Sequence, residues 1–518
     1  MSHSSEHDAP SSHASTDEGD EAPDYADRIL KGGGSVFSGS LIAKAVGFAL
    51  QVVLGRGFGK TLYGLYSYGL SVLRIVRELS TLGLQNGVVR FGAEHREDGN
   101  EAALKGTFLA VGGLGTGAGV LMGGALYLAA PWLSEVALRS TNDPLVFQLF
   151  GTALPFYVFT YLGSRMARAL GQMRVDVLLD SILQPALFLL LTGIILLLGQ
   201  GFTVALYAFL ASTVLAAGAS VYAAYRLFPP LFSSLAPTVD LRTLLRFSLP
   251  IVGVSLASIG LARADRIMLG PLAGEEAVGL YTAASKMSVQ LRFVLFALTA
   301  AFSPVISELY HSGRTDELAQ LYADTVRWIA LGTLPLAVVL IVFAPDIMAL
   351  FGTEFREGAL LLRVLAGAYI VVAGSGSVGH MLQMSDHQDF AFWVNASMAV
   401  LNVGLNWILI QWYGVVGAAL ATGAAHVLGN VFQLWGLYHF THIQPFRWNL
   451  WKPLAAAGAS GAVAWVLFAQ LASLSRWLVG IPVALLVYGG VLLALGLSPR
   501  DQAIADDLWA ELRTRLGA

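Results

Sequence analysis

Residues 54–68, LGRGFGKTLYGLYSY, and residues 269–283, LGPLAGEEAVGLYTA, are two copies of the stretch that decides the fold. The copies align without a gap at a spacing of 215 residues and share a Gly-Leu-Tyr run. Each copy ends one apolar stretch and begins the next. Self-similarity on this scale predicts two halves of one architecture that face each other. The alternative is a chance likeness between two Gly-rich turns, but the apolar stretches around the copies also correspond.

The composition is that of an integral membrane protein. Of the 518 residues, 56% are hydrophobic and only 13% are charged, whereas soluble domains carry about 25% charged residues. A net charge of −3 gives no argument for nucleic-acid binding, so we expect no nucleic-acid partner. Cysteine is absent, which excludes disulfides, thiolate metal sites and cysteine nucleophiles.

Apolar stretches of about 20 residues, each long enough to cross a bilayer as a helix, predict about fourteen membrane spans. The first six lie at residues 33–55, 62–87, 106–130, 145–169, 176–198 and 202–225. The others lie at residues 247–264, 277–307, 327–344, 359–384, 391–411, 415–439, 453–471 and 477–497. We therefore predict an all-α integral membrane protein with two six-helix lobes, related by a pseudo-two-fold axis, and two extra C-terminal helices.

The spans divide the chain into six segments. They are a disordered tail (1–28), the N-lobe (29–226), a cytoplasmic connection (227–246), the C-lobe (247–440), the two extra spans (441–497) and an amphipathic segment (498–518). The tail is too polar to bury a core, so it is predicted to be disordered. The last segment repeats leucine at helical spacing and is predicted to lie on the membrane surface.

Basic residues in the connections predict the orientation of the chain. One set of alternating connections holds Arg90, Arg96, Lys105, Arg165, Arg168, Arg174, Arg226, Arg242, Arg246, Arg314, Arg447 and Lys452. The opposite set holds fewer, chiefly Arg56, Lys60, Arg139, Arg266, Arg356 and Arg476. The richer side is predicted to be cytoplasmic. Both termini then lie inside the cell, and the protein is a multi-pass protein of the cell (inner) membrane.

Several charged residues lie inside the predicted spans, where a charge costs several kcal/mol unless it faces a cavity or a partner. The best candidates to line a cavity are Arg74, Arg77, Lys286 and Arg292. Because guanidinium groups bind phosphate oxygens in a bidentate geometry, a positive cavity favours a phosphate-bearing substrate. We predict that these four cations bind the substrate.

Other charges leave two interpretations open. Glu78 shares a helix face with Arg74 and either holds that arginine in place or carries a proton. Arg263, Asp265 and Arg266 form either a structural ion pair or part of the functional site. A further group either anchors helix ends at the cytoplasmic edge or faces the cavity; its members are Arg165, Arg168 and Arg174, with Asp176 and Asp180 as their possible ion-pair partners.

No catalytic motif is recognisable in the sequence. It has no Walker loop, no nucleophile elbow and no metal-spaced cluster of His, Asp and Glu. His380, His387, Asp386 and Asp389 lie in one predicted cytoplasmic turn and are best explained as a solvated loop. We therefore predict a protein that is not an enzyme, with no catalytic residues, metal or cofactor.

At this point four stretches resemble a known family. Residues 264–270 (ADRIMLG) with 279–286 (GLYTAASK), residues 33–40 (GGSVFSGS) and residues 414–422 (GVVGAALAT) resemble the Wzx-type polysaccharide and O-antigen flippases. These belong to the superfamily of multidrug, oligosaccharidyl-lipid and polysaccharide exporters. The likeness covers about residues 30–495 and depends on a spread pattern rather than one motif.

The resemblance implies a function in the biosynthesis of surface polysaccharide such as lipopolysaccharide O-antigen. A family member moves an undecaprenyl-diphosphate-linked oligosaccharide from the cytoplasmic to the outer leaflet by alternating access, often with cation or proton coupling. The partners implied are this polyprenyl-linked substrate, the lipid bilayer and, as candidates, polysaccharide polymerase or export machinery. The family's cationic cavity fits Arg74, Arg77, Lys286 and Arg292, and Glu78 or Asp265 is a candidate for coupling.

Three alternatives remain from the sequence. A lipid II flippase fits the two extra spans equally well. A MATE-type cation-coupled drug exporter predicts more carboxylates than cations in the cavity, and the balance here is the reverse. A membrane glycosyltransferase or ligase acting on a polyprenyl carrier requires a large external loop or paired acidic residues, whereas the predicted external connections are short.

Overall fold

The computed structural model describes residues 22–137, 144–446 and 448–496, and within these ranges the chain is helical with no strand. Eleven of the described helices are long and apolar enough to cross a membrane. These findings confirm an all-helical, multi-pass membrane protein. Helix α1 begins at Ala22, inside the segment predicted as a disordered tail, and the rest of that tail, 1–21, lies outside the described residues. The predicted amphipathic segment 498–518 also lies outside them.

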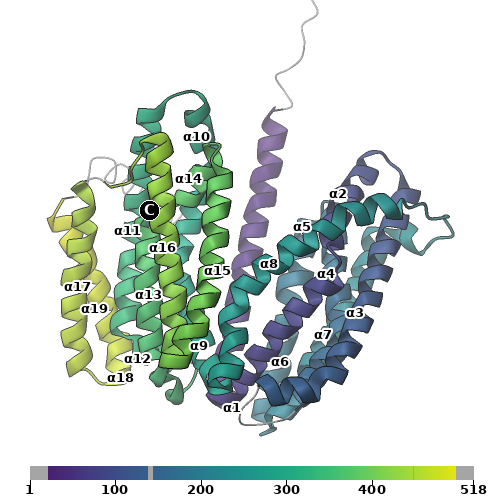
Figure 1. The fold of residues 1–518 in the computed structure, drawn as a ribbon, viewed down its shortest axis with the longest axis horizontal. Helices are drawn as coiled ribbons and strands as arrows, with labels where there is room; N and C mark the ends of the chain where they lie inside the picture. The colour runs from purple at the N-terminus through teal and green to yellow at the C-terminus, as the bar shows by residue number, and fades with distance from the viewer. Residues whose placement is uncertain (1–21, 138–143, 447, 497–518) are drawn as a thin grey trace, which may run out of the picture.

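Apart from α8 (Leu241–Ala273), which crosses from the second group to pack against α2 (Leu84–Glu97) of the first, the helices form two groups that meet at one end and diverge toward the other (Figure 1). The first group contains α1 (Ala22–Ser80), α2 (Leu84–Glu97), α3 (Glu101–Ala137), α4 (Leu145–Ala169), α5 (Met173–Val177), α6 (Gln184–Leu197) and α7 (Phe202–Leu227). The second contains α8 (Leu241–Ala273), α9 (Glu275–Ser288), α10 (Arg292–His311), α11 (Thr315–Val342), α12 (Ala344–Met348), α13 (Ala359–Gly374), α14 (Val378–Met384), α15 (Gln388–Tyr413) and α16 (Val415–Thr441). We call these groups the N-lobe and the C-lobe.

The two copies of the repeated stretch have the same backbone conformation. Helix α1 is kinked at Gly59, where φ is 78° and ψ is 172°. Gly274 separates α8 from α9 with φ 85° and ψ 174°. Gly59 and Gly274 are 215 residues apart, which is the spacing of the sequence repeat. Positive φ with extended ψ is open to glycine almost alone, so both copies require glycine at this point.

The copies also pack against each other, where the lobes meet. A Cβ atom at Gly64 would lie 1.8 Å from the carbonyl oxygen of Glu275, and one at Gly279 would lie 2.1 Å from that of Lys60. These two contacts are equivalent under the repeat, because 60 corresponds to 275 and 64 to 279. The pseudo-two-fold axis therefore passes between α1 and α9, at the point where the backbones of these two helices are in contact.

Charged groups hold the same end of the molecule together. The Lys60 ammonium lies 2.6 Å from carboxylate oxygens of both Glu276 and Glu357. The Lys60 backbone N–H donates to the Glu354 carboxylate at 2.9 Å, and Arg56 Nε donates to the Leu350 carbonyl at 2.8 Å. The N-lobe is thus joined to the C-lobe at this end, which we call the closed end.

Two predicted spans are interrupted in the structure. The span predicted at 277–307 is broken by a 3₁₀ turn, Val289–Leu291, into α9 and α10. The span predicted at 359–384 is broken between α13 and α14, where Gly376 has a φ of 67°. A third difference is α2, a separate helix that follows the second span instead of extending it. The mean hydropathy of a stretch does not change at a short break in the helix, so the sequence predicted continuous spans.

The two extra helices are α17 (Trp451–Gln470) and α19 (Ile481–Ala494), joined through α18 (Ser473–Ser475) and packed on α11 of the C-lobe (Figure 1). Their connection is fixed by Asp346, a buried residue of α12. Arg476 and Ser473 donate hydrogen bonds to its carboxylate at 3.1 and 3.2 Å, and Arg356 lies at 3.6 Å.

Replacing Asp346 with alanine is expected to loosen this attachment. The change leaves Arg476 without its carboxylate in a partly buried position, and breaking a buried ion pair costs about 3–5 kcal/mol. The check is the melting temperature of the detergent-purified protein, which should fall for Asp346→Ala. The control is Glu317→Ala, which removes an exposed ion pair to Arg314 and should change the melting temperature little. Equal melting temperatures for both variants would contradict this role of Asp346.

Candidate functional site

Four of the intramembrane cations lie close together where the lobes face each other. Arg74 comes from the second half of α1, Arg263 from α8 and Lys286 from α9. Arg74, Arg266 and Arg263 lie near enough to Lys286 to repel its charge, and Arg74, Arg266 and Arg77 repel the charge of Arg263 in the same way. We call Arg74, Arg263, Arg266 and Lys286 the cation cluster. It joins a predicted N-lobe cation to a predicted C-lobe cation.

Within the described part of the chain, no carboxylate forms an ion pair with a side chain of the cation cluster. Lys286 lies in the last turn of α9, a helix that packs against α1, and its side chain is exposed. The Nε atoms of Arg77, Arg266 and Arg292 are buried and have no hydrogen-bond partner among the described residues. Like charges without counter-ions repel each other in a low-dielectric region, so this arrangement favours an anionic ligand.

Arg77 lies beside the cluster on an aromatic support. Its guanidinium carbon is 4.1 Å from the centre of the Tyr161 ring. The carboxylate of Glu78 lies 3.7 Å from Arg77 and accepts a 2.8 Å hydrogen bond from Gln85. Glu78 therefore contacts its neighbour Arg77 and not Arg74, the residue one turn away.

Two other N-lobe arginines, Arg165 and Arg168, are neutralised by aspartates. Arg165 lies 2.6 Å from Asp180, and Arg168 lies 2.5 Å from Asp176. Asp180 belongs to a π-helical turn, Leu178–Leu183, between α5 and α6. The structure thus separates two kinds of arginine that look alike in the sequence: those paired with aspartate and those left without a carboxylate.

Asp265 is a buried carboxylate of α8, next in the chain to Arg266. It accepts hydrogen bonds from the Tyr281 hydroxyl and, at 2.8 Å, from the backbone N–H of Arg266. The Arg266 side chain turns to Ser285 instead, at 3.3 Å. Tyr281 also lies 3.0 Å from the Thr422 hydroxyl. The charge of Asp265 is therefore held by hydroxyl and backbone groups, and Arg266 remains free of an acidic partner among the described residues.

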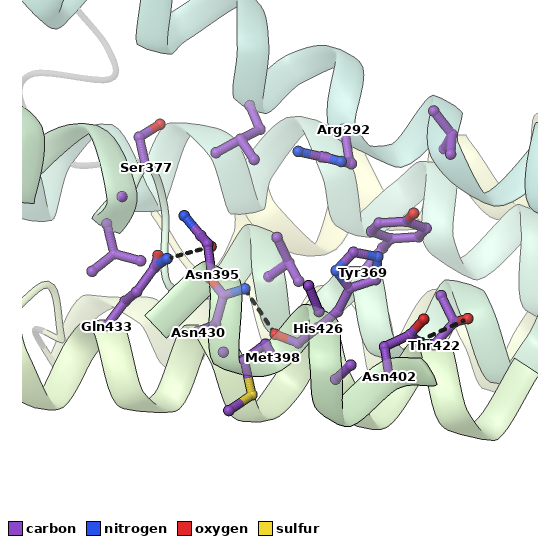
Figure 2. Close-up of a pocket in the computed structure, with 18 of the residues that line it drawn as sticks. Arg292, Tyr369, Ser377, Asn395, Met398, Asn402, Thr422, His426, Asn430 and Gln433 are labelled. Atoms are coloured by element: carbon purple, nitrogen blue, oxygen red, sulfur yellow. Dashed lines mark hydrogen bonds between the residues drawn. The ribbon is translucent and has the colours of Figure 1, made fainter. Parts of the chain in front are cut away.

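Arg292 lines a pocket inside the C-lobe, and Arg266 of the cation cluster lines the same pocket. This pocket has a volume of about 670 Å³ and lies between α8, α9, α10, α13, α14, α15 and α16. Figure 2 shows Arg292 beside Tyr369 and His426, with a row of amides extending away from them. The amides that line the pocket are Gln383, Asn395, Asn402, Asn430 and Gln433.

Sequence reasoning missed this pocket, although a signal for it was present. Thr422, His426, Asn430 and Gln433 recur every three or four residues along α16 and so share one face of the helix. Asn395 and Asn402 are seven residues apart, about two helical turns, and so share a face of α15. A stripe of uncharged polar side chains inside an apolar span indicates a polar interior surface. A search for charged residues alone does not detect such a stripe. His380, expected in a solvated loop, also lines the pocket.

Comparison with known proteins gives two matching family models. The model described as "Polysaccharide biosynthesis protein" matches residues 29–310, more than half of the chain, and includes both copies of the repeat. The model described as "MatE" matches residues 250–408. The first match contains Arg74, Arg77, Lys286 and Arg292.

Among curated relatives, the chain is 26% identical over 204 residues to the probable low-salt glycan biosynthesis flippase Agl15 of Haloferax volcanii, covering 39% of this chain and 43% of that protein. It is 24% identical over 257 residues to the probable multidrug resistance protein NorM of Neisseria meningitidis, covering 48% of this chain and 52% of that protein. The chain thus spans about half the length of the curated relatives it matches.

Solved structures show the same fold. The lipid II flippase MurJ in an inward closed conformation superimposes with a TM-score of 0.65 at 12% identity, over 88% of this chain and 97% of that one. A multidrug resistance MATE family transporter in an inward-facing conformation superimposes with a TM-score of 0.64 at 18% identity, over 77% and 95%. Together with the match over residues 29–310, these findings show that the chain belongs to the polysaccharide biosynthesis protein family of membrane proteins.

Proposed function

We propose that this protein is a flippase that moves a polyprenyl-diphosphate-linked oligosaccharide across the cell membrane for surface polysaccharide biosynthesis. The observation that carries the proposal is the cation cluster, in which four cations lie together without a carboxylate partner among the described residues. A diphosphate supplies the missing negative charge and accepts hydrogen bonds from guanidinium groups. The likeness to a protein named as a glycan biosynthesis flippase supports this choice of substrate.

The arrangement of the lobes supports a mechanism of alternating access. They diverge at the end where α2 and α10 lie, and this is the side predicted to be cytoplasmic (Figure 1). Contacts of Lys60, Gly64 and Gly279 join the lobes at the other end. In this state the cation cluster receives the diphosphate from the cytoplasmic leaflet. Opening of the closed end and closure of the cytoplasmic end then release it on the outer side.

The two other transport functions make different demands on the site. A cationic drug needs carboxylates free to bind it, but Glu78 and Asp265 are already held by Arg77, Gln85, Tyr281 and a backbone N–H. Lipid II is itself a polyprenyl diphosphate carrying sugars, so the cation cluster suits it equally. The proposed substrate class therefore includes lipid II, and a transport assay distinguishes the members of the class.

The test uses the purified protein in liposomes that contain undecaprenyl-diphosphate-linked oligosaccharide with labelled sugars. We expect protein-dependent movement of the glycan to the opposite leaflet, measured by its accessibility to an impermeant oxidant. Parallel liposomes carry lipid II or the cationic dye ethidium. Movement of lipid II alone would assign the protein to that substrate. Ethidium transport without glycolipid movement would overturn the proposal in favour of a drug exporter.

A further inference from the structure

We propose that the C-lobe pocket binds the sugars of the lipid-linked glycan, and that Asn395 and Gln433 select them through their amide groups. This inference rests on the proposed function. It assigns the two parts of the substrate to different places: the diphosphate to the cation cluster and the adjoining sugars to the pocket inside the C-lobe. Recognition of the glycan is then a property of one lobe only.

The amide pair presents both kinds of hydrogen-bonding group to the pocket. Gln433 Nε2 donates a 3.0 Å hydrogen bond to Asn395 Oδ1 (Figure 2). This bond orients both side chains and leaves Asn395 Nδ2 as a donor and Gln433 Oε1 as an acceptor. Gln433 is only 8% exposed, whereas Asn395 is exposed to the pocket. Neighbouring hydroxyls of a sugar each donate and accept, so they match such a pair.

The wall beside this pair is neutral and polar, and the charged residues Asp265, Arg266 and Arg292 line other parts of the pocket. Asn430 accepts from the Ser375 hydroxyl at 2.8 Å and donates to the His426 carbonyl at 3.0 Å. The Tyr369 and His426 rings lie 5.4 Å apart and provide apolar faces for the C–H groups of a sugar ring. Pockets for small ligands combine such apolar faces with a few placed polar groups.

Both interruptions of the predicted spans border this pocket. Val289 lies in the 3₁₀ turn between α9 and α10, and Gly376 and Ser377 lie between α13 and α14; all three line the pocket. Non-helical backbone at membrane depth is tolerated where it is buried in protein or lines a polar cavity. The breaks therefore widen the interior of the C-lobe at the level of Arg292 and of the amides.

The pocket has a direction and a suitable size. Figure 2 places the Asn395–Gln433 pair toward one end of the pocket and Asn402 and Thr422 toward the other, with Arg292 between them. Along α16, Thr422 and Gln433 are separated by eleven residues, or roughly 16 Å at 1.5 Å per residue. The volume of about 670 Å³ accommodates a short run of sugars. In contrast, the N-lobe hollow beside Arg77 and Asp180 holds about 10 Å³, the space of one water molecule.

The experiment compares two ligands on the full-length protein in nanodiscs. One probe is undecaprenyl diphosphate without sugars, and the other is the lipid-linked glycan extracted from cells that lack the gene. The variants are Asn395→Leu and Gln433→Leu, which keep the side-chain size and remove the amide. The control is Gln411→Leu on α15, because this exposed amide bonds only to the Trp407 carbonyl of its own helix among the described residues.

We expect each pocket variant to bind the glycolipid about tenfold more weakly, the effect of losing a hydrogen bond of roughly 1–1.5 kcal/mol. Binding of undecaprenyl diphosphate should stay unchanged in both variants, and the control should match the wild type with both ligands. Unchanged glycolipid binding in both variants would overturn the inference while leaving the proposed function intact. An equal loss of both ligands would also overturn it, and failure of the wild type to bind either lipid would remove the proposed function itself.

Discussion

Gly64→Ala is expected to abolish transport and to destabilise the protein, because there is no room for a methyl group at this point. The added Cβ would lie 1.8 Å from the Glu275 carbonyl oxygen, and that oxygen belongs to a helix backbone that cannot move aside alone. Overpacking in a core costs about 1–3 kcal/mol even where side chains can adjust. The two lobes must therefore separate at the closed end or shift along each other.

The measurements for Gly64→Ala are the glycolipid flipping rate and the melting temperature in detergent. The equivalent change Gly279→Ala should have the same effect, since its Cβ would lie 2.1 Å from the Lys60 carbonyl. The control is Gly113→Ala on α3, where a Cβ meets nothing within 4 Å and alanine is the better helix former. Wild-type flipping by Gly64→Ala would show that the contact of α1 with α9 is not needed in the transport cycle.

The second large effect is expected from Lys286→Gln, which should remove most of the transport activity while making the protein more stable. Lys286 lies among Arg74, Arg263 and Arg266, so its removal relieves repulsion between like charges. The same change removes a charge-assisted contact to the diphosphate, and such contacts contribute about 1.5–3 kcal/mol. A loss of roughly ten- to a hundredfold in flipping follows.

A higher melting temperature together with a lower flipping rate distinguishes a cation that binds the ligand from one that stabilises the structure. A structural cation would lower the melting temperature when it is neutralised. Arg74→Gln should behave as Lys286→Gln does, whereas Arg226→Gln at the exposed end of α7 should alter neither quantity. Retention of full flipping by both Lys286→Gln and Arg74→Gln would exclude the cation cluster as the site for the diphosphate.

The fold was predictable from the sequence because its main determinants are local. Long apolar stretches gave the helices, and the Gly-Leu-Tyr repeat marked the junctions at Gly59 and Gly274 with their shared backbone conformation. The interruptions at 289–291 and 375–377 were not predictable in the same way. They depend on a neighbouring cavity that makes broken helix tolerable, and a single apolar stretch does not reveal its neighbours.

The candidate site was predictable in its charge but not in its shape. In the sequence, Arg74 and Arg165 are both arginines inside predicted spans, and nothing there shows which of them has a carboxylate partner. Pairing of Arg165 with Asp180 is a tertiary contact between α4 and the π-helical turn after α5. The C-lobe pocket was hidden for a related reason. Asparagine and glutamine carry no charge, so a search for intramembrane charges does not find them, and the pocket that they line is formed only when α15 and α16 pack together.

The α17–α19 pair breaks the symmetry of the molecule at its outer boundary. Helix α11 buries Ala330 and Leu334 against Ala456 and Tyr488 of this pair. Its counterpart under the repeat is α3, which keeps apolar side chains such as Leu121 and Leu128 bare. The two flanks therefore contact the surrounding lipid differently. Helices α17 and α19 separate α11 from the acyl chains, whereas the exposed apolar side chains of α3 contact the acyl chains directly.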